Sequence, residues 1–173
     1  MSKGLPRSLS RGSTSRQAVT KLTLPLTGVQ VTVSSTGAAI GFGTVVIGGL
    51  PEAHIKLMAV ACQLQLAGNG ADANLSDTWD GDFAVGTTPV DDATITAGDA
   101  DLIASTALGA ATAEVSPLHV VPNGVDAVFD NTAGGLEVNL NVLIDAADIV
   151  DDESVILDAF GVVEITLITM LDE

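Results

Sequence analysis

The strongest constraint on this chain is an alternation of apolar and polar residues from position 136 to position 142, after which Leu143 and Ile144 are both apolar. The apolar set is Leu136, Val138, Leu140, Val142 and Ile144, and the polar set between them is Glu137, Asn139 and Asn141. Successive side chains of a β-strand point to opposite faces, so this period indicates a strand with one buried face. Val29, Val31 and Val33 alternate with polar neighbours in the same way and predict a second such strand.

Other segments are apolar on both faces. Residues 54–66 and 161–171 predict strands that are covered on both sides, by a second sheet or by a neighbouring subunit. A helix is the alternative for 54–66, but the alternation of Gln63 and Gln65 favours a strand. Shorter strands are expected within 38–48 and 80–87. Only residues 99–110 are expected to form a helix, with Asp99 or Asp101 as its N-cap and Gly109 at its end.

Turn-forming residues separate these segments at intervals of about ten residues. They are Gly48-Gly49-Leu50-Pro51, Gly68-Asn69-Gly70, Asn123-Gly124 and Gly134-Gly135. Short strands separated by regularly spaced turns predict an all-β, antiparallel sandwich or barrel. A length of 173 residues suits a single domain. No apolar run reaches the ~18 residues of a membrane span, so no membrane contact is expected.

Charge divides the chain into two regions. The first 51 residues carry five cations and no acid, a formal charge of +5, whereas the remaining 122 carry 22 acids and one cation, a formal charge of −21. Residues 1–21, rich in Ser, Gly and Arg, are expected to be a flexible basic arm, and residues 22–173 the body. The candidate partner-binding residues are the cations of this arm: Lys3, Arg7, Arg11, Arg16 and Lys21.

An acidic protein surface is the expected partner of the arm. Nucleic acid is the weaker alternative, because the acidic body would repel phosphates and the arm has no aromatic residue to stack on a base. A transit peptide and a tail with no specific partner are the remaining interpretations.

Neither catalysis nor a cofactor is expected. His54 and His119 are far apart in the sequence, and the chain has no GxSxG, P-loop or dinucleotide-binding glycine motif. Cys62 is the only cysteine, which excludes an internal disulfide and indicates a buried, inert thiol. No metal site is expected either: the acids from Asp145 to Glu153 could supply calcium ligands, but they do not match the twelve-residue calcium loop, and solvated loop acids are the simpler interpretation.

Three segments resemble a family of tailed-bacteriophage structural proteins. The segments are DGDFAVGTTPVDDATITAGDADLIASTALG from residue 80, LNVLIDAADIVDD from residue 140, and LPEAHIKLMA from residue 50. The resemblance extends over about residues 28–171. Its most specific parts are Gly81-Asp82-Phe83, Ser105-Thr106-Ala107 and Asp145-Ala146-Ala147-Asp148-Ile149.

The resemblance implies a capsid decoration or cement protein. Such a protein is a β-sandwich of jelly-roll type, often a homotrimer, which binds the major capsid protein on the outer surface of the phage head and stabilises capsomer junctions. The family has no catalytic residues to transfer. The alternative is a head-fibre or receptor-binding sandwich that recognises carbohydrate, for which Trp79, between Asp77 and Asp80, is the one available indole.

Overall fold

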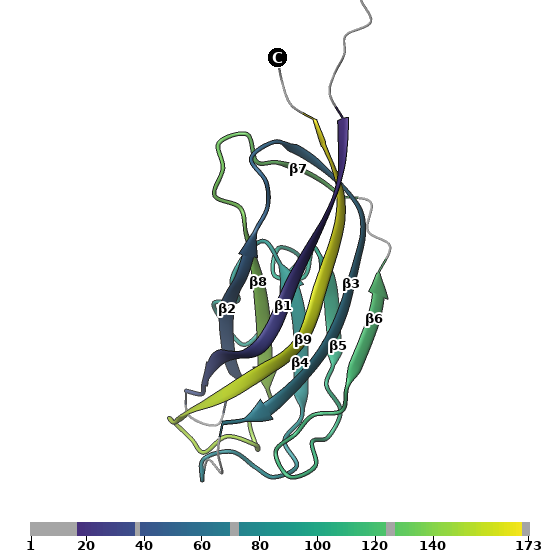
Figure 1. Cartoon of the computed structure of the whole chain (residues 1–173). Coiled ribbons are helices and arrows are strands. Elements are labelled where there is room, and N and C mark those ends of the chain that lie inside the picture. The colour runs from purple at the N-terminus through teal and green to yellow at the C-terminus, as the bar shows by residue number, and fades with distance from the viewer. Residues whose placement is uncertain (1–16, 37–38, 70–72, 124–126, 171–173) are drawn as a thin grey trace, which may run out of the picture.

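The computed structural model describes residues 17–36, 39–69, 73–123 and 127–170, and every regular element within these ranges is a β-strand (Figure 1). The strands are β1 (Gln17–Ser34), β2 (Gly41–Gly49), β3 (His54–Gly68), β4 (Gly81–Gly86), β5 (Ile103–Ala107), β6 (His119–Asn123), β7 (Val128–Asp130), β8 (Glu137–Ile144) and β9 (Ser154–Met170). Among the described residues, no helix has the length and apolarity that crossing a bilayer requires.

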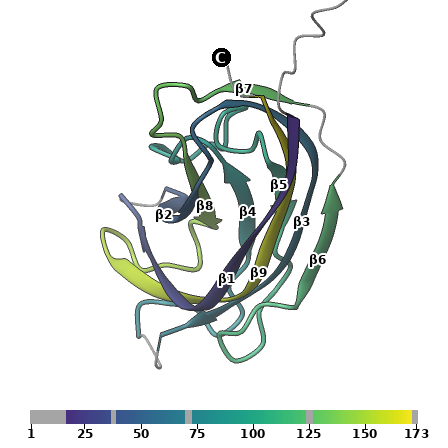
Figure 2. The same ribbon diagram turned by 45° about the horizontal axis from the view of Figure 1, so that its top comes forward.

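The strand order is that of a jelly roll. The strands follow one another as β5-β4-β8-β2-β1-β9-β3-β6, with the short β7 beside β3, and all pairs are antiparallel. The β1–β2 junction is narrow, with Ser34 opposite Phe42 as its register pair. The sheet therefore curls there into two facing four-stranded layers, β1-β9-β3-β6 and β2-β8-β4-β5, as Figures 1 and 2 show. This is the double-sheet arrangement of two Greek keys, and it confirms the predicted fold class.

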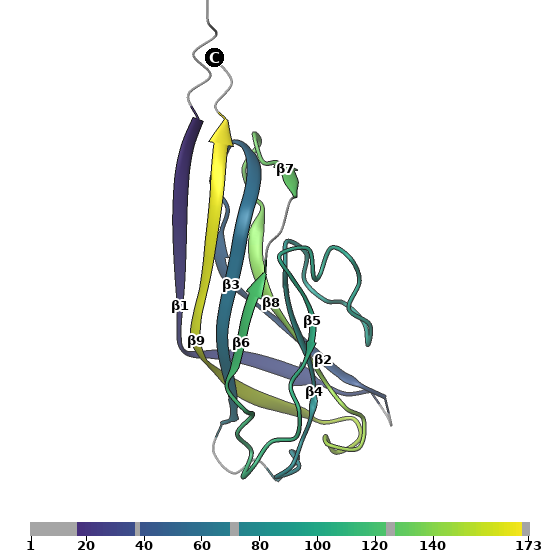
Figure 3. The same ribbon diagram turned by 90° about the vertical axis from the view of Figure 1, so that its right-hand side faces the viewer.

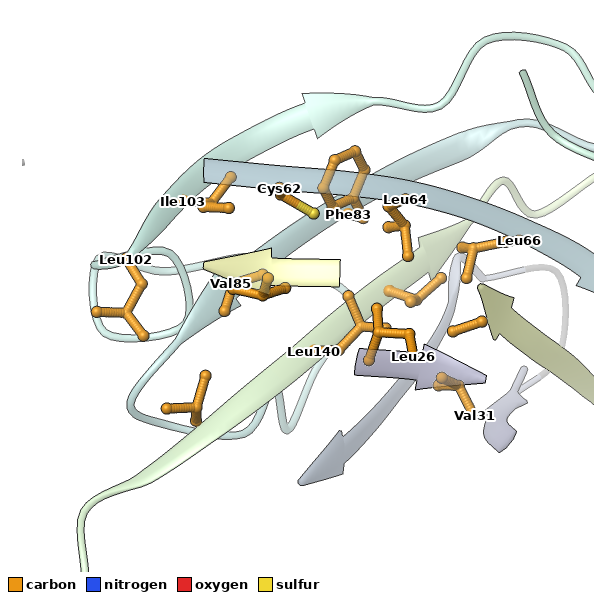
Figure 4. Packing of buried hydrophobic residues seen from close by; sticks show 14 of the residues in the cluster. Leu26, Val31, Cys62, Leu64, Leu66, Phe83, Val85, Leu102, Ile103 and Leu140 are labelled. Carbon is orange, nitrogen blue, oxygen red and sulfur yellow. The ribbon is translucent and has the colours of Figure 1, made fainter. Parts of the chain in front are cut away.

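The core lies between the two layers and is mainly aliphatic. Leu26 and Val31 of β1, Leu64 and Leu66 of β3, and Leu140 of β8 point into it (Figure 4). Its largest fully buried side chains are Trp79 and Phe83. Branched aliphatic side chains suit facing pleated surfaces, because they fill the gap between two sheets with little loss of rotamer freedom.

The long strands β1 and β9 bend together near their centres. They pair from Gln17 opposite Met170 to Ser34 opposite Ser154, with a bulge at Gly28. Close to the bulge, Gly161 pairs with Leu26 and has φ +134°, and a Cβ there would lie 2.0 Å from the carbonyl oxygen of Gln63. Only glycine permits this close approach of backbones, and the bend swings the lower halves of both strands towards β2 (Figure 3).

Two sequence-based expectations are wrong. Residues 99–110 form no helix; they contain β5, which pairs with β4 from Asp82 opposite Ala107 to Val85 opposite Ile103. Burial of Ile103 and Leu108 in the sandwich outweighs local helix propensity. The expected arm is also too long: residues 17–21 belong to β1 and pair with β9, so the strand begins inside the segment assigned to the arm.

Candidate interaction surface

The outer face of the β2-β8-β4-β5 layer is covered by the chain itself. Asn141 of β8 points outward yet is fully buried, because residues 87–102 pack over it. Its Nδ2 donates to the carbonyl oxygens of Thr88 (3.0 Å) and Asp99 (2.8 Å), and its Oδ1 accepts from Val90 N (3.0 Å) and Thr44 Oγ1 (2.7 Å). Figure 3 shows the covering segment between β4 and β5 on the side opposite β1.

Buried Asp99 holds this covering segment in shape. Its Oδ2 accepts from the N–H and hydroxyl of Thr96, both at 2.7 Å, and its Oδ1 accepts from the Thr88 hydroxyl at 2.8 Å. Burial alone would raise the pKa of Asp99, but the hydrogen bonds from Thr96 and Thr88 outweigh it, and the net pKa is lowered. The acid expected to cap a helix instead closes a loop.

The outer face of the β1-β9-β3-β6 layer is different, because no described segment covers its centre, where Ala61, Gln63 and Val120 are exposed. The four strands contain two acids, Asp158 and Glu164, and two lysines, Lys21 and Lys56, so their formal charge is zero. The other 20 acids of the chain lie outside these strands. We call the outward side of this layer the low-charge face.

Five large, exposed apolar side chains lie on the strands of the low-charge face. Val120 of β6 is 62% exposed and Phe160 of β9 is 42% exposed. The others on these strands are Val19, Met58 and Ile156. Exposed apolar side chains on a sheet of zero formal charge are typical of a surface that contacts another protein.

A groove of about 240 Å³ crosses the centre of this face, between β3, β6 and β9. Its outward-facing lining consists of Ala61, Gln63, Val120, Val162 and Glu164. Ala61 and Glu164 are register partners, as are Gln63 and Val162 on the next row of the same strands. The small side chain of Ala61 between longer neighbours leaves the hollow.

Of the five predicted partner-binding cations, the structure describes only Lys21. Its Nζ lies 2.7 Å from Glu164 Oε1, and both side chains are partly exposed, so solvent screens the ion pair. Lys21 therefore projects from a strand of the low-charge face. Lys3, Arg7, Arg11 and Arg16 lie outside the described residues.

The two histidines and the cysteine contact neighbouring groups of the fold. His119 lies 2.9 Å through Nε2 from the Leu108 carbonyl oxygen and its ring packs on Phe83, whereas His54 lies 3.5 Å from an Asp130 carboxylate oxygen. Cys62 is buried, as expected, and burial raises the pKa of its thiol to about 12, so the thiolate nucleophile is scarce at neutral pH.

Trp79 cannot serve as a sugar-binding platform. It is fully buried, and its Nε1–H donates to the Glu114 carbonyl oxygen at 3.1 Å. The alternative in which Trp79 binds carbohydrate is therefore wrong, because a stacking platform must expose one face of the ring.

Carboxylates meet at the end of the molecule where β4 begins. Asp148 Oδ2 accepts from Asp80 N at 3.0 Å, and Asp145 lies beside Asp80. Burial, with the negative charge of Asp145 and a hydrogen bond to it, raises the pKa of Asp80. No group of three His, Cys, Asp or Glu side chains in the described part of the chain is placed to hold a metal ion.

The low-charge face is the feature that the sequence did not reveal. Residues 54–66 and 161–171 were expected to be covered on both sides, but their pairing in one layer emerges only from the strand order. A usable signal was the scarcity of acids in both segments, which contain Glu164 alone in a chain with 22 acids.

No protein-family model matches the chain, and no curated protein matches it either. Among solved structures, a chain described as "Structure of infectious bursal disease virus Gt strain" is similar at 11% identity and a TM-score of 0.38 over 88% of this protein. This protein spans 35% of that chain's length. A second, described as "Crystal structure of 60-mer BFDV Capsid Protein", is similar at 8% identity and a TM-score of 0.36, over 92% of this protein and 96% of that chain.

Proposed function

We propose that this protein is a virion structural protein of the capsid decoration type, bound to the outer surface of a phage head. The separation of charge carries the proposal: a formally neutral sheet face, whose centre no described segment covers, lies on a body that is otherwise strongly acidic. The resemblance of residues 28–171 to phage decoration proteins is consistent with this role.

The low-charge face would turn towards other virion subunits. Buried charges must be desolvated, and this face has few of them, so most of the apolar area that it buries would count towards binding. Apolar burial contributes about 25 cal/mol per Å² before the costs of association are subtracted. A subunit that bridges capsomers opposes their separation, and many copies on one shell add up through multivalency.

The acidic loops would face the solvent. Asp91 and Asp92 of the segment that covers the other layer are exposed, as are Asp151, Asp152 and Glu153. Charge of one sign over the outside of a particle keeps particles apart and soluble. The arm cations Lys3, Arg7, Arg11 and Arg16 remain the proposed contacts to an acidic partner surface.

We also propose that the protein assembles as a homotrimer. The charges of the four strands of the low-charge face balance, whereas most other surfaces of two copies would repel one another. A closed symmetric ring would use the same contact on every copy and leave none of these contact surfaces free.

Addition of the purified full-length chain to heads that lack it tests the proposed function. We expect the chain to sediment with the heads and to raise the temperature at which they release DNA, since bridged capsomers separate less readily. Heads that neither retain the chain nor gain heat resistance at micromolar concentrations would contradict the proposal.

A further inference from the structure

The groove on the low-charge face combines apolar walls with a carboxylate at one end. Ala61, Val120 and Val162 give it an apolar lining, and Glu164, the register partner of Ala61, contributes the carboxylate. A long unbranched cation matches this arrangement, because its methylene stem packs on apolar surface while its charged head pairs with the carboxylate. Arginine matches best, because its planar guanidinium binds a carboxylate through two parallel hydrogen bonds.

Glu164 can accept a second cation. The ion pair with Lys21 joins Nζ to Oε1 at 2.7 Å, and the carboxylate has a second oxygen and further lone pairs. The side chain of Lys21 is 57% exposed, so its pairing with Glu164 is screened and can be shared with a further partner at little cost.

The chain itself supplies arginines. All three, Arg7, Arg11 and Arg16, lie within residues 1–16, a segment without an acid. This segment joins the body at Gln17, opposite Met170 at the end of the low-charge face. From Met170 to Val162 is eight residues of strand, about 26 Å, whereas sixteen extended residues reach about 50 Å.

The direction of β1 favours a second copy of the chain as the source of the arginine that enters the groove. β1 runs from Gln17 into the body, and Gln17 pairs with Met170 at the end of the sheet. To reach its own groove, the segment would have to reverse at once and run back along β1 and β9. A neighbouring copy placed beyond that end offers its groove without such a reversal.

We propose that the groove of each copy receives an arginine from residues 1–16 of a second copy. This contact names the partner of the arm and so rests on the proposed assembly into virions. It is heterologous, groove to arm, and such contacts close into a ring when the rotation between copies closes, as a ring of three copies would. The basic arm also supplies the attraction that two acidic bodies lack.

Two complementary full-length variants test this contact. Ala61→Leu fills the groove of a chain whose arm is intact, and Ala59→Leu, on the same face of the same strand but outside the groove, is its matched control. The second variant replaces Arg7, Arg11 and Arg16 by Gln and keeps the groove open. Glu164→Gln is an independent groove variant, which removes the charge and leaves the strand as it is.

The native mass is measured by sedimentation velocity at low salt. We expect the wild type and Ala59→Leu to assemble, and Ala61→Leu and the arm variant each to sediment as a single chain of 17.4 kDa. Glu164→Gln should weaken assembly. An equal mixture of Ala61→Leu and the arm variant should form a complex of two chains, since one supplies the arm and the other the groove.

Three results would overturn the contact: a wild type that remains a single chain, an Ala61→Leu or arm variant that assembles like the wild type, or a mixture that forms no complex. Binding to heads is a separate readout. If the wild type stabilises heads while the mixture fails to associate, the proposed function stands and this contact alone is wrong.

Discussion

Asn141 uses its whole amide to join segments that are far apart in the sequence. It ties β8 to Thr44 of β2 and to three positions of the covering segment, and it is fully buried. Asn139 lies two residues away on the same strand face and is also buried, but its Nδ2 has no hydrogen-bond partner. The two asparagines should therefore contribute differently to the stability of the fold.

Asn141→Ala should lower the free energy of unfolding by about 3 kcal/mol, because it leaves several buried donors and acceptors without partners. Asn139→Ala is the matched control and should cost about 1 kcal/mol. Urea denaturation of both variants at neutral pH measures the difference. Equal losses would show that Asn141 does not hold the covering segment to the sheet.

At the scale of elements, the close approach of β9 to β3 depends on Gly161. A methyl group there would meet the Gln63 carbonyl oxygen at 2.0 Å, and φ is positive as well. Gly135 also has a positive φ, +93°, but nothing lies within 4 Å of a Cβ built on it. Comparing alanine substitutions at Gly161 and Gly135 therefore separates the cost of backbone strain from the cost of a steric clash between strands.

Gly161→Ala should therefore destabilise the protein by several kcal/mol, whereas Gly135→Ala should cost only the strain of a positive φ, about 1–2 kcal/mol. Thermal unfolding followed by circular dichroism compares the two. A Gly161→Ala protein that is as stable as Gly135→Ala would contradict the account of the bend.

The strands were predictable where apolar and polar residues alternate, although the expectation that only one face of residues 136–144 is buried is wrong, because residues 87–102 also cover the polar face of β8. The alternation at 136–144 and at 29–33 appears in β8 and β1. The helix predicted over residues 99–110 is absent because local helix propensity does not account for tertiary contacts. Leu102, Ile103 and Leu108 are buried by the sandwich. Asp99 accepts hydrogen bonds from Thr88 and Thr96. The start of β1 was missed because its pairing with β9 extends well before Val29.

At the scale of the whole molecule, the division of charge was visible in the sequence, but its arrangement in space was not. The long strands β3 and β9 are 86 residues apart along the chain from Gly68 to Ser154, and the jelly-roll order makes them neighbours. Together with β1 and β6, they gather two acids and two lysines onto one layer. The low-charge face is therefore a property of topology.

The central claim is that the low-charge face is the side through which this protein joins a virion. The most direct test is the binding to heads of two matched variants, Val120→Glu on that face and Val46→Glu on the outer side of the other layer. Val120 and Val46 are both exposed, at 62% and 49%, so neither change should unfold the protein. We predict that Val120→Glu loses at least tenfold in affinity and that Val46→Glu binds like the wild type. Equal binding by both variants, or a loss confined to Val46→Glu, would contradict the account.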